Sequence, residues 1–294
     1  MTVPARPKQE DGKICVQKIA PNVLIARVNL AANGAKKDIL FRSDAHHDSA
    51  LCDRRLETKH LDQAVERDAW ILDTGDVFDA MGGPDDRRNR NAELRDPHLR
   101  KPYFDSIVEE AAKDYKPYAD RWLMLGRGNH ETSVEDRYGT DLIARLAHDL
   151  NVHTGEYAGW IGFRCDLGGN RSNTVWLYYH HGPSTGGINK GINSVARMSS
   201  YLADANIVCS GHSHDQWIAS HPVAKISKFG KEYLSNQLHV RAPGYKEEWL
   251  GSAGRFHIKT AKPPKPTGAI WLTLYADSSD KASSLVKYEA AMAL

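Results

Sequence analysis

The sequence has few of the features that mark secreted, membrane-spanning or nucleic-acid-coating proteins. Its four cysteines lie far apart and form no Cys-x-x-Cys pair, so we expect neither a disulfide framework nor a cysteine-ligated zinc site. No stretch approaches about 18 unbroken apolar residues, and the polar N-terminus lacks the apolar core of a signal peptide. We therefore expect a cytoplasmic protein that does not contact a membrane.

An excess of charge of one sign is also missing. The net charge is +2 and the pI is near 8.2, which is too even for a protein that coats nucleic acid. Histidine, by contrast, is abundant, with 14 residues in a chain of 294. The positions of these histidines, and of the acids near them, carry most of the functional information.

Apolar periodicity predicts strands that alternate with helices along most of the chain. The predicted strands are a hairpin over 13–29 and runs at 39–41, 70–75, 122–125, 175–179, 207–209 and 270–274. The predicted helices cover 53–68, 104–115, 142–150 and 195–202. The polar tail from Asp277 is expected to be loose. Without a repeat or a sharp boundary, 1–294 is predicted to be one domain, with its motifs in 44–214 and a β-rich C-terminal part, 217–294.

Five of the predicted strands end in acids, histidines or an asparagine. In an α/β fold the carboxyl ends of neighbouring strands meet at one edge, where such proteins place their sites. One polar pair after a strand is an ordinary turn, but five such pairs are a much rarer coincidence. The pairs are Asp44 and His46, Asp76 and Asp79, Asn129 and His130, His180 and His181, and His212 and His214.

The donor types predict a metal centre. Carboxylates, imidazoles and an amide oxygen, without thiolate, suit Mn²⁺, Fe or Zn²⁺. We expect seven of these ten side chains to be ligands. Seven ligands are too many for one four-coordinate ion and suit two ions that share a carboxylate. Two ions about 3.5–4 Å apart can bind a phosphoryl oxygen and hold a bridging hydroxide for in-line attack. The sequence therefore predicts a dinuclear centre for phosphate-ester hydrolysis.

In their order, these motifs resemble the signature of the calcineurin-like metallophosphoesterases. The matching blocks are Asp44-x-His46, Gly75-Asp76-x-x-Asp79, Gly128-Asn129-His130-Glu131, His180 and Gly211-His212-x-His214. The runs 43–48, 52–55, 86–88 and 239–246 are also similar to bacteriophage-encoded members, which implies a bacterial or phage-infected host cell. The resemblance implies a four-layer αββα sandwich of two mixed β-sheets. The strands up to Trp122 would form one sheet, and those from Val175 onward the other.

The resemblance also implies a role for each site residue. One ion, expected to be Mn²⁺, would be held by Asp44, His46, Asp76 and His214. The other would be held by Asp76, Asn129, His180 and His212, with Asp76 as the bridge. At the fourth motif we prefer His180, and His181 is the alternative if the strand ends one residue later. His130, oriented by Asp79, would be the acid for the leaving oxygen, because a neighbouring carboxylate favours the cationic imidazole.

The expected activity is hydrolysis of phosphate esters, preferably diesters. DNA or RNA is a candidate substrate because the segment 84–101 is rich in arginine. Arg87, Arg88 and Arg197 are candidates to bind a substrate phosphate, although a surface salt bridge is the simpler explanation for each. The alternatives are a phosphomonoesterase or phosphoprotein phosphatase, and a non-catalytic scaffold of the same fold. A phosphoprotein phosphatase is less favoured, because those enzymes carry an arginine directly after the second aspartate of this motif, where this chain has Ala80. The oligomeric state stays open.

Overall fold

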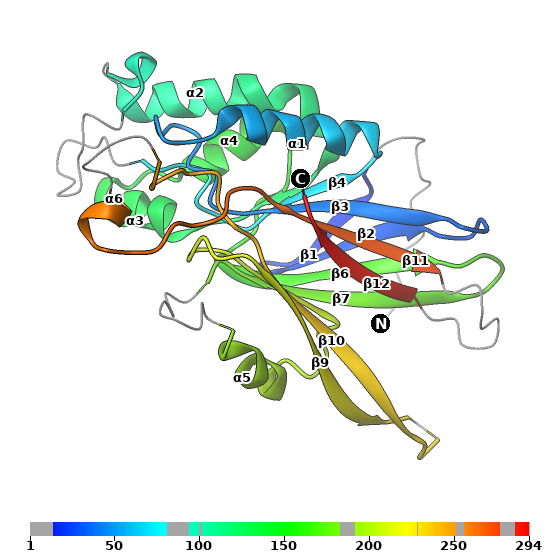
Figure 1. Cartoon of the computed structure of the whole chain (residues 1–294). Coiled ribbons are helices and arrows are strands. Elements are labelled where there is room, and N and C mark those ends of the chain that lie inside the picture. The colour runs from blue at the N-terminus through cyan, green and yellow to red at the C-terminus, as the bar shows by residue number, and fades with distance from the viewer. Residues whose placement is uncertain are drawn as a thin grey trace.

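Two mixed β-sheets pack face to face in the computed structural model, which describes residues 14–80, 94–99, 102–182, 192–227, 229–250, 256–276 and 286–293 (Figure 1). In the five-stranded sheet the order is β12 (Val286–Met292), β11 (Ile270–Ala276), β3 (Lys36–Arg42), β4 (Trp70–Asp73) and β5 (Trp122–Leu125). In the seven-stranded sheet it is β1 (Val16–Ala20), β2 (Val23–Asn29), β6 (Ala158–Asp166), β7 (Ser172–His180), β8 (Ile207–Ser210), β10 (Glu232–Arg241) and β9 (Trp217–Ile226).

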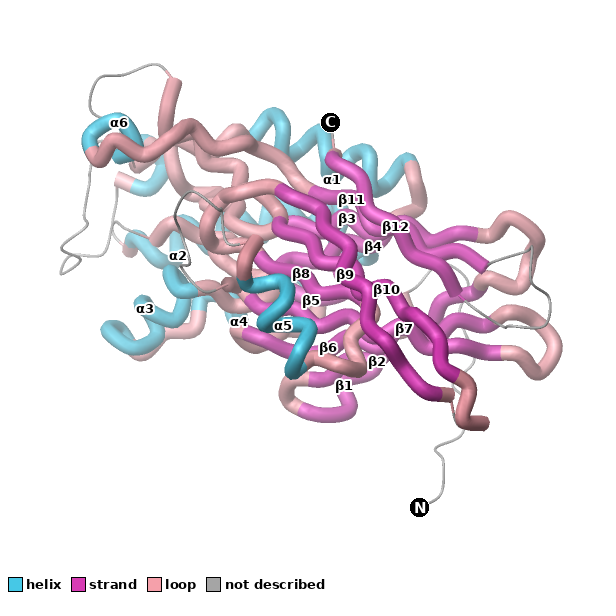
Figure 2. Tube along the Cα trace, turned by 60° about the horizontal axis from the view of Figure 1, so that its bottom comes forward, coloured by secondary structure: helices cyan, strands magenta, loops and turns pink. Residues whose placement is uncertain are grey.

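Helices cover the outer faces of both sheets, which completes a four-layer αββα sandwich and confirms the predicted fold class (Figures 1 and 2). The helices over the five-stranded sheet are α1 (Arg54–Glu66), α2 (Tyr103–Tyr115) and α4 (Leu142–Leu150). On the seven-stranded sheet, α5 (Ser194–Tyr201) packs Met198 against Val208 and Trp160. The remaining helical segments are α3 (Asn129–Tyr138), α6 (Phe256–Lys259) and the 3-10 turns η2 (Asp96–His98) and η3 (Lys116–Arg121). Among the described residues, no helix is both long and apolar enough to cross a membrane.

The central strands of the five-stranded sheet are buried on both faces. In β3, Ile39 and Phe41 point into the core between the sheets, whereas Leu40 faces α1 and α2. This explains why the strand reads as an unbroken apolar run without alternation. On the seven-stranded sheet, Leu24 and Phe163 contribute to the same core. Burial of their side chains therefore holds these strands in place, and the polar motifs follow the ends of the strands.

The expected division of strands between the sheets is wrong at both ends of the chain. The early hairpin β1–β2 belongs to the seven-stranded sheet, where β2 pairs with β6 in parallel. The late strand β11 belongs to the five-stranded sheet, where Ile270 is paired with Phe41 of β3. Pairing between segments so far apart depends on tertiary contacts, and local periodicity does not encode it.

Besides the short segments α6, η2 and η3, the sequence analysis did not predict β6, α3 or β12. In β6 the glycines Gly159 and Gly162 weaken the strand signal, and α3 is polar over most of its length. β12 lies in the tail that was expected to be loose, and it pairs antiparallel with β11 from Ile270 to Ala276. α3 matters most for function, because its first residue is Asn129 of the third motif.

Candidate metal centre

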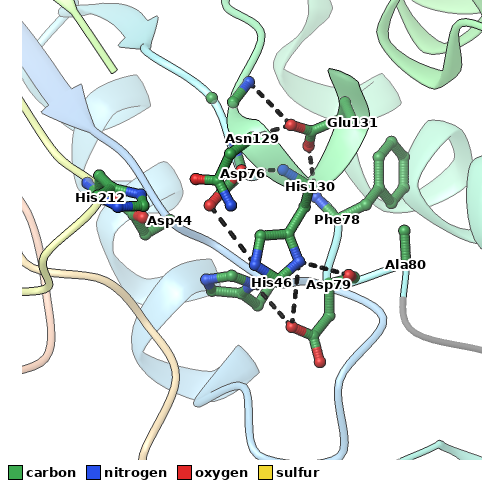
Figure 3. Close-up of polar contacts among 12 residues, drawn as sticks. Asp44, His46, Asp76, Phe78, Asp79, Ala80, Asn129, His130, Glu131 and His212 are labelled. Atoms are coloured by element: carbon green, nitrogen blue, oxygen red, sulfur yellow. Dashed lines mark hydrogen bonds and ion pairs between the residues drawn. The ribbon is translucent and has the colours of Figure 1, made fainter. Parts of the chain in front are cut away.

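The loops after β3, β4, β5, β7 and β8 meet at one edge of the two sheets. Among the described residues they bring together three groups of side chains whose metal-ligand atoms lie within 4.8 Å of one another, and two of these groups share no residue. The first group is Asp44, His46 and His214, and the second is Asp76, His181 and His212. The groups adjoin, because the His212 backbone N–H donates to Asp44 Oδ2 at 2.7 Å. Figure 3 shows Asp44 and His212 on one side of this centre, with Asp76, His46 and His130 facing them.

In the first group, atoms that could bind a metal face one another. His46 Nε2 lies 3.2 Å from His214 Nε2, and His214 Nε2 lies 3.4 Å from Asp44 Oδ1. Asp44 Oδ1 is buried and accepts no hydrogen bond from the described residues. A buried carboxylate oxygen without a hydrogen bond costs free energy unless a cation compensates it. The donor set therefore fits a divalent ion.

The second group is held in position by the backbone. His181 Nε2 lies 3.1 Å from both Asp76 Oδ2 and Asn129 Oδ1, and His181 Nδ1 donates to the Thr74 carbonyl at 3.1 Å. A carbonyl partner at Nδ1 leaves the Nε2 lone pair available to a metal. Burial alone would lower the pKa of His181, but Asp76 raises it to about 10. A metal that binds here would displace that proton.

His181, and not His180, occupies the place that the sequence analysis assigned to the fourth motif. β7 continues through His180, so the two side chains point to opposite faces of the strand. The His180 ring packs edge-on against Tyr157, with centroids 5.3 Å apart, and lies outside both groups. The preference for His180 is therefore corrected, because the strand ends one residue later than expected.

The loops that carry these side chains adopt unusual backbone conformations. Asp44, His46, Asp76, His212 and His214 all have φ between 47° and 68°, in the left-handed region. Such residues persist only where the surrounding structure imposes the conformation, and they gather at functional sites. A close approach at Gly128 adds to this constraint, since a Cβ there would lie 2.0 Å from Asp76 Oδ1. The centre is thus built by the backbone as much as by the side chains.

Asp79 and His130 are neighbours, but in a different manner from the one expected. His130 Nδ1 donates to the Asp79 main-chain oxygen at 2.6 Å, while the Asp79 carboxylate oxygen Oδ1 is 3.7 Å from the same nitrogen (Figure 3). The carboxylate instead lies 3.0 Å from His46 Nδ1. Burial alone would lower the pKa of His130, but Asp76 and Asp79 raise it above its usual value. His130 is thus favoured as a cation.

Two acids that the sequence analysis did not assign hold the turn from Asp76 to Ala80. Glu131 accepts hydrogen bonds from the N–H groups of Asp76 and Phe78, at 3.1 and 2.9 Å, and from that of Gly128 at 2.9 Å (Figure 3). Asp48 accepts from the N–H groups of Asp79 and Ala80, at 2.6 and 3.0 Å. Glu131 stands at the third position of α3, where the spacing of a capping box could have indicated it.

The arginines proposed to bind a substrate phosphate gain no support. Arg87 and Arg88 lie outside the described residues. Arg197 is exposed on α5, and no contact within the described part of the chain joins it to either ligand group.

Comparison with known proteins gives similarity at the level of solved structures. No family model matches the sequence, and no curated protein matches it significantly. The calcineurin-like phosphoesterase YfkN from Bacillus subtilis aligns with 14% identity over 87% of this chain and 90% of its own, with a TM-score of 0.42. An uncharacterised predicted phosphoesterase from Streptococcus pneumoniae aligns with 13% identity over 88% of this chain and 100% of its own, at 0.33. Vacuolar Protein Sorting 29 from Cryptosporidium parvum aligns with 11% identity over 87% of this chain and 97% of its own, at 0.37. TM-scores below 0.5 assign neither a family nor an activity to this chain.

Proposed function

We propose that this protein is a phosphoesterase that uses two divalent metal ions to hydrolyse phosphodiesters. The observation that carries the proposal is the juxtaposition of two complete carboxylate–imidazole groups, Asp44–His46–His214 and Asp76–His181–His212. One such group alone would suit a structural ion. Two adjoining groups, with a histidine that is favoured as a cation beside them, suit phosphoryl transfer to water.

The chain's own residues divide into ligands and a proton donor. Asp44, His46 and His214 would hold one ion, and His181 and His212 the other. Asp76 would lie between the ions, and Asn129 would add an amide oxygen to the second. When bound, the metals supply positive charge for a phosphoryl oxygen and activate the attacking water. We propose Mn²⁺ as the first ion to assay, since carboxylate, amide and imidazole donors all suit it.

His130 is proposed as the acid for the leaving oxygen. Its Nδ1 is occupied by the Asp79 carbonyl at 2.6 Å, so the proton that it can donate is on Nε2. Asp76 and Asp79 favour the cation, which is the form that protonates an alkoxide. The side chain is 11% exposed, and its Nε2 lies 3.8 Å from Asp76 Oδ2, beside the proposed metal centre.

The first experiment compares wild type with Asp76→Asn in Mn²⁺-dependent hydrolysis of an aryl phosphodiester. We expect turnover by the wild type and its loss in the variant, because the variant removes the shared charge. Equal rates for the two proteins would reject the proposal. Fewer than one bound ion per wild-type chain after Mn²⁺ loading would also reject it, and would favour the non-catalytic scaffold.

The ester class follows from a panel of aryl phosphomonoesters, small diesters, cyclic nucleotides, DNA and RNA under Mn²⁺. We propose nucleic acid as the diester substrate on the basis of the basic segment 84–101. Its cleavage should weaken with added salt, since phosphate contacts are screened. Good turnover of small diesters with inert DNA and RNA would reject the nuclease while leaving the diesterase intact. Preferential hydrolysis of monoesters would reject both the nuclease and the diesterase and would favour a phosphomonoesterase.

A further inference from the structure

A segment beyond the recognised motifs is built into the metal centre. Gly244 packs so closely on the first loop that a Cβ there would lie 2.8 Å from the Asp44 carbonyl oxygen and 3.2 Å from His214 Nδ1. The Tyr245 N–H donates to that same Asp44 oxygen at 3.0 Å. The backbone of the next residue, Lys246, pairs with that of Cys52 in an isolated antiparallel β-bridge. The chain therefore passes directly behind the first ligand group.

Lys246 forms a buried ion pair with Asp79, which lies 167 residues earlier in the chain. Its Nζ is 3.1 Å from Asp79 Oδ1 and 3.0 Å from Oδ2, and both side chains are 5% exposed. The Asp79 main chain is fixed independently, because Asp48 accepts a hydrogen bond from its N–H at 2.6 Å. The carboxylate is thus confined between the ammonium group and His46.

The position of the Asp79 carboxylate decides between two metal sites in which His46 could take part. His46, Asp79 and His130 form a third group with ligand atoms within 4.8 Å, and it shares His46 with the first group. A metal bound there would need the Asp79 oxygens, which already contact an ammonium group. A second cation against that carboxylate would be repelled at short range inside the protein. His46 Nδ1 instead faces Asp79 Oδ1 at 3.0 Å, and its Nε2 points toward His214.

We propose that Lys246 is a positioning residue of the metal centre, acting through Asp79. As a fixed cation, it keeps the Asp79 carboxylate out of the metal-ligand set and aimed at His46, so that His46 presents Nε2 beside Asp44 and His214. The inference rests on the metal centre of the proposed function. It does not depend on which ester is hydrolysed.

A double-mutant cycle on metal binding tests this role. Mn²⁺ affinity and stoichiometry are measured by titration calorimetry and electron paramagnetic resonance for wild type, Lys246→Met, Asp79→Asn and the double variant. We expect Lys246→Met to weaken the first metal site by about 10–100-fold, as for other residues that orient a ligand. In the Asp79→Asn background the same substitution should add little, because the carboxylate it acts through is gone.

Two further variants separate positioning from a general loss of structure. Lys246→Arg keeps the charge and should restore most of the affinity. Lys37→Met removes a lysine–aspartate pair elsewhere, where Lys37 Nζ lies 3.0 Å from Asp68 Oδ2, and should leave metal binding unchanged. If Lys246→Met failed to fold, the inference would stand or fall on Lys246→Arg and Asp79→Asn.

Equal losses from Lys246→Met in both backgrounds, or no loss in either, would overturn the inference. Loss of affinity in Lys246→Arg to the level of Lys246→Met would also overturn it. These readouts are independent of hydrolysis. A protein that binds two ions with the expected couplings but hydrolyses no ester would reject the proposed function alone.

Discussion

Asp79 holds His130 through its main-chain oxygen, 2.6 Å from His130 Nδ1, and directs its carboxylate to His46 instead. The two functions of Asp79 are therefore separable by mutation. The main-chain contact survives any change of side chain, whereas the contact to His46 depends on the carboxylate.

We predict that Asp79→Asn and His130→Ala have different kinetic signatures. Asp79→Asn should lower metal affinity by about 10–100-fold. At saturating Mn²⁺ it should lower kcat less than His130→Ala does, because the main-chain oxygen still holds the ring although part of the charge that favours its cation is lost. His130→Ala should keep both ions and lower kcat by about 10²–10⁴-fold with an alkyl leaving group. The loss should shrink with p-nitrophenolate, which needs little protonation. The prediction fails if both variants show the same leaving-group dependence.

The neighbouring histidines His180 and His181 form a matched pair for mutagenesis. His181→Gln should remove one bound ion and most of the activity, because its Nε2 lies 3.1 Å from both Asp76 and Asn129. His180→Gln should leave two ions bound, since His180 belongs to neither ligand group. Metal content by mass spectrometry decides between them. Loss of an ion from His180→Gln alone would reverse the assignment.

Glu131 is predicted to stabilise the turn that presents Asp76. Its carboxylate accepts three backbone N–H groups, whereas the glutamine of Glu131→Gln has only one acceptor oxygen. We expect a loss of about 1–3 kcal/mol in the free energy of unfolding, measured in urea. Glu135→Gln on the same helix is the control, because Glu135 is 42% exposed and pairs with Arg127. Equal, small effects in the two variants would contradict this role.

The buried His239 predicts acid sensitivity of the fold. Burial lowers its pKa to about 4, with a further contribution from His221. Its Nε2 donates to Gln237 Oε1 at 2.7 Å. Its Nδ1 is buried and has no hydrogen-bond partner among the described residues, so protonation of Nδ1 places a charge in the protein interior without compensation.

The unfolded chain, with an ordinary pKa of 6.5, binds the proton more readily than the native protein. The contribution of neutral His239 is complete above pH 6.5 and is lost as the pH falls toward about 4. His239→Gln should flatten this part of the stability curve, measured by urea unfolding across the range. His148→Gln, at a side chain that is 89% exposed, should not. Parallel curves for wild type and His239→Gln would refute the assignment.

Most of the candidate site could be predicted because each motif follows an apolar run that forms a strand, and strand ends in α/β folds gather at one edge. The choice between His180 and His181 could not, since a one-residue change in strand length exchanges the two faces. The partnership of Lys246 with Asp79 was also hidden, because it joins segments 167 residues apart. The predicted sheet was wrong for β2 and β11 for the same reason, since each pairs with a segment far away in the sequence.

The left-handed backbone of five proposed ligands has a consequence for transplanting this centre. Each such residue costs of order 1–3 kcal/mol, which only the assembled fold supports. A peptide copied from any one loop would relax to an ordinary conformation and turn its side chain away. Asparagine tolerates the left-handed region, while a β-branched residue does not. Grafting this centre onto another protein would therefore require copying the framework beneath the ligands along with the ligands themselves.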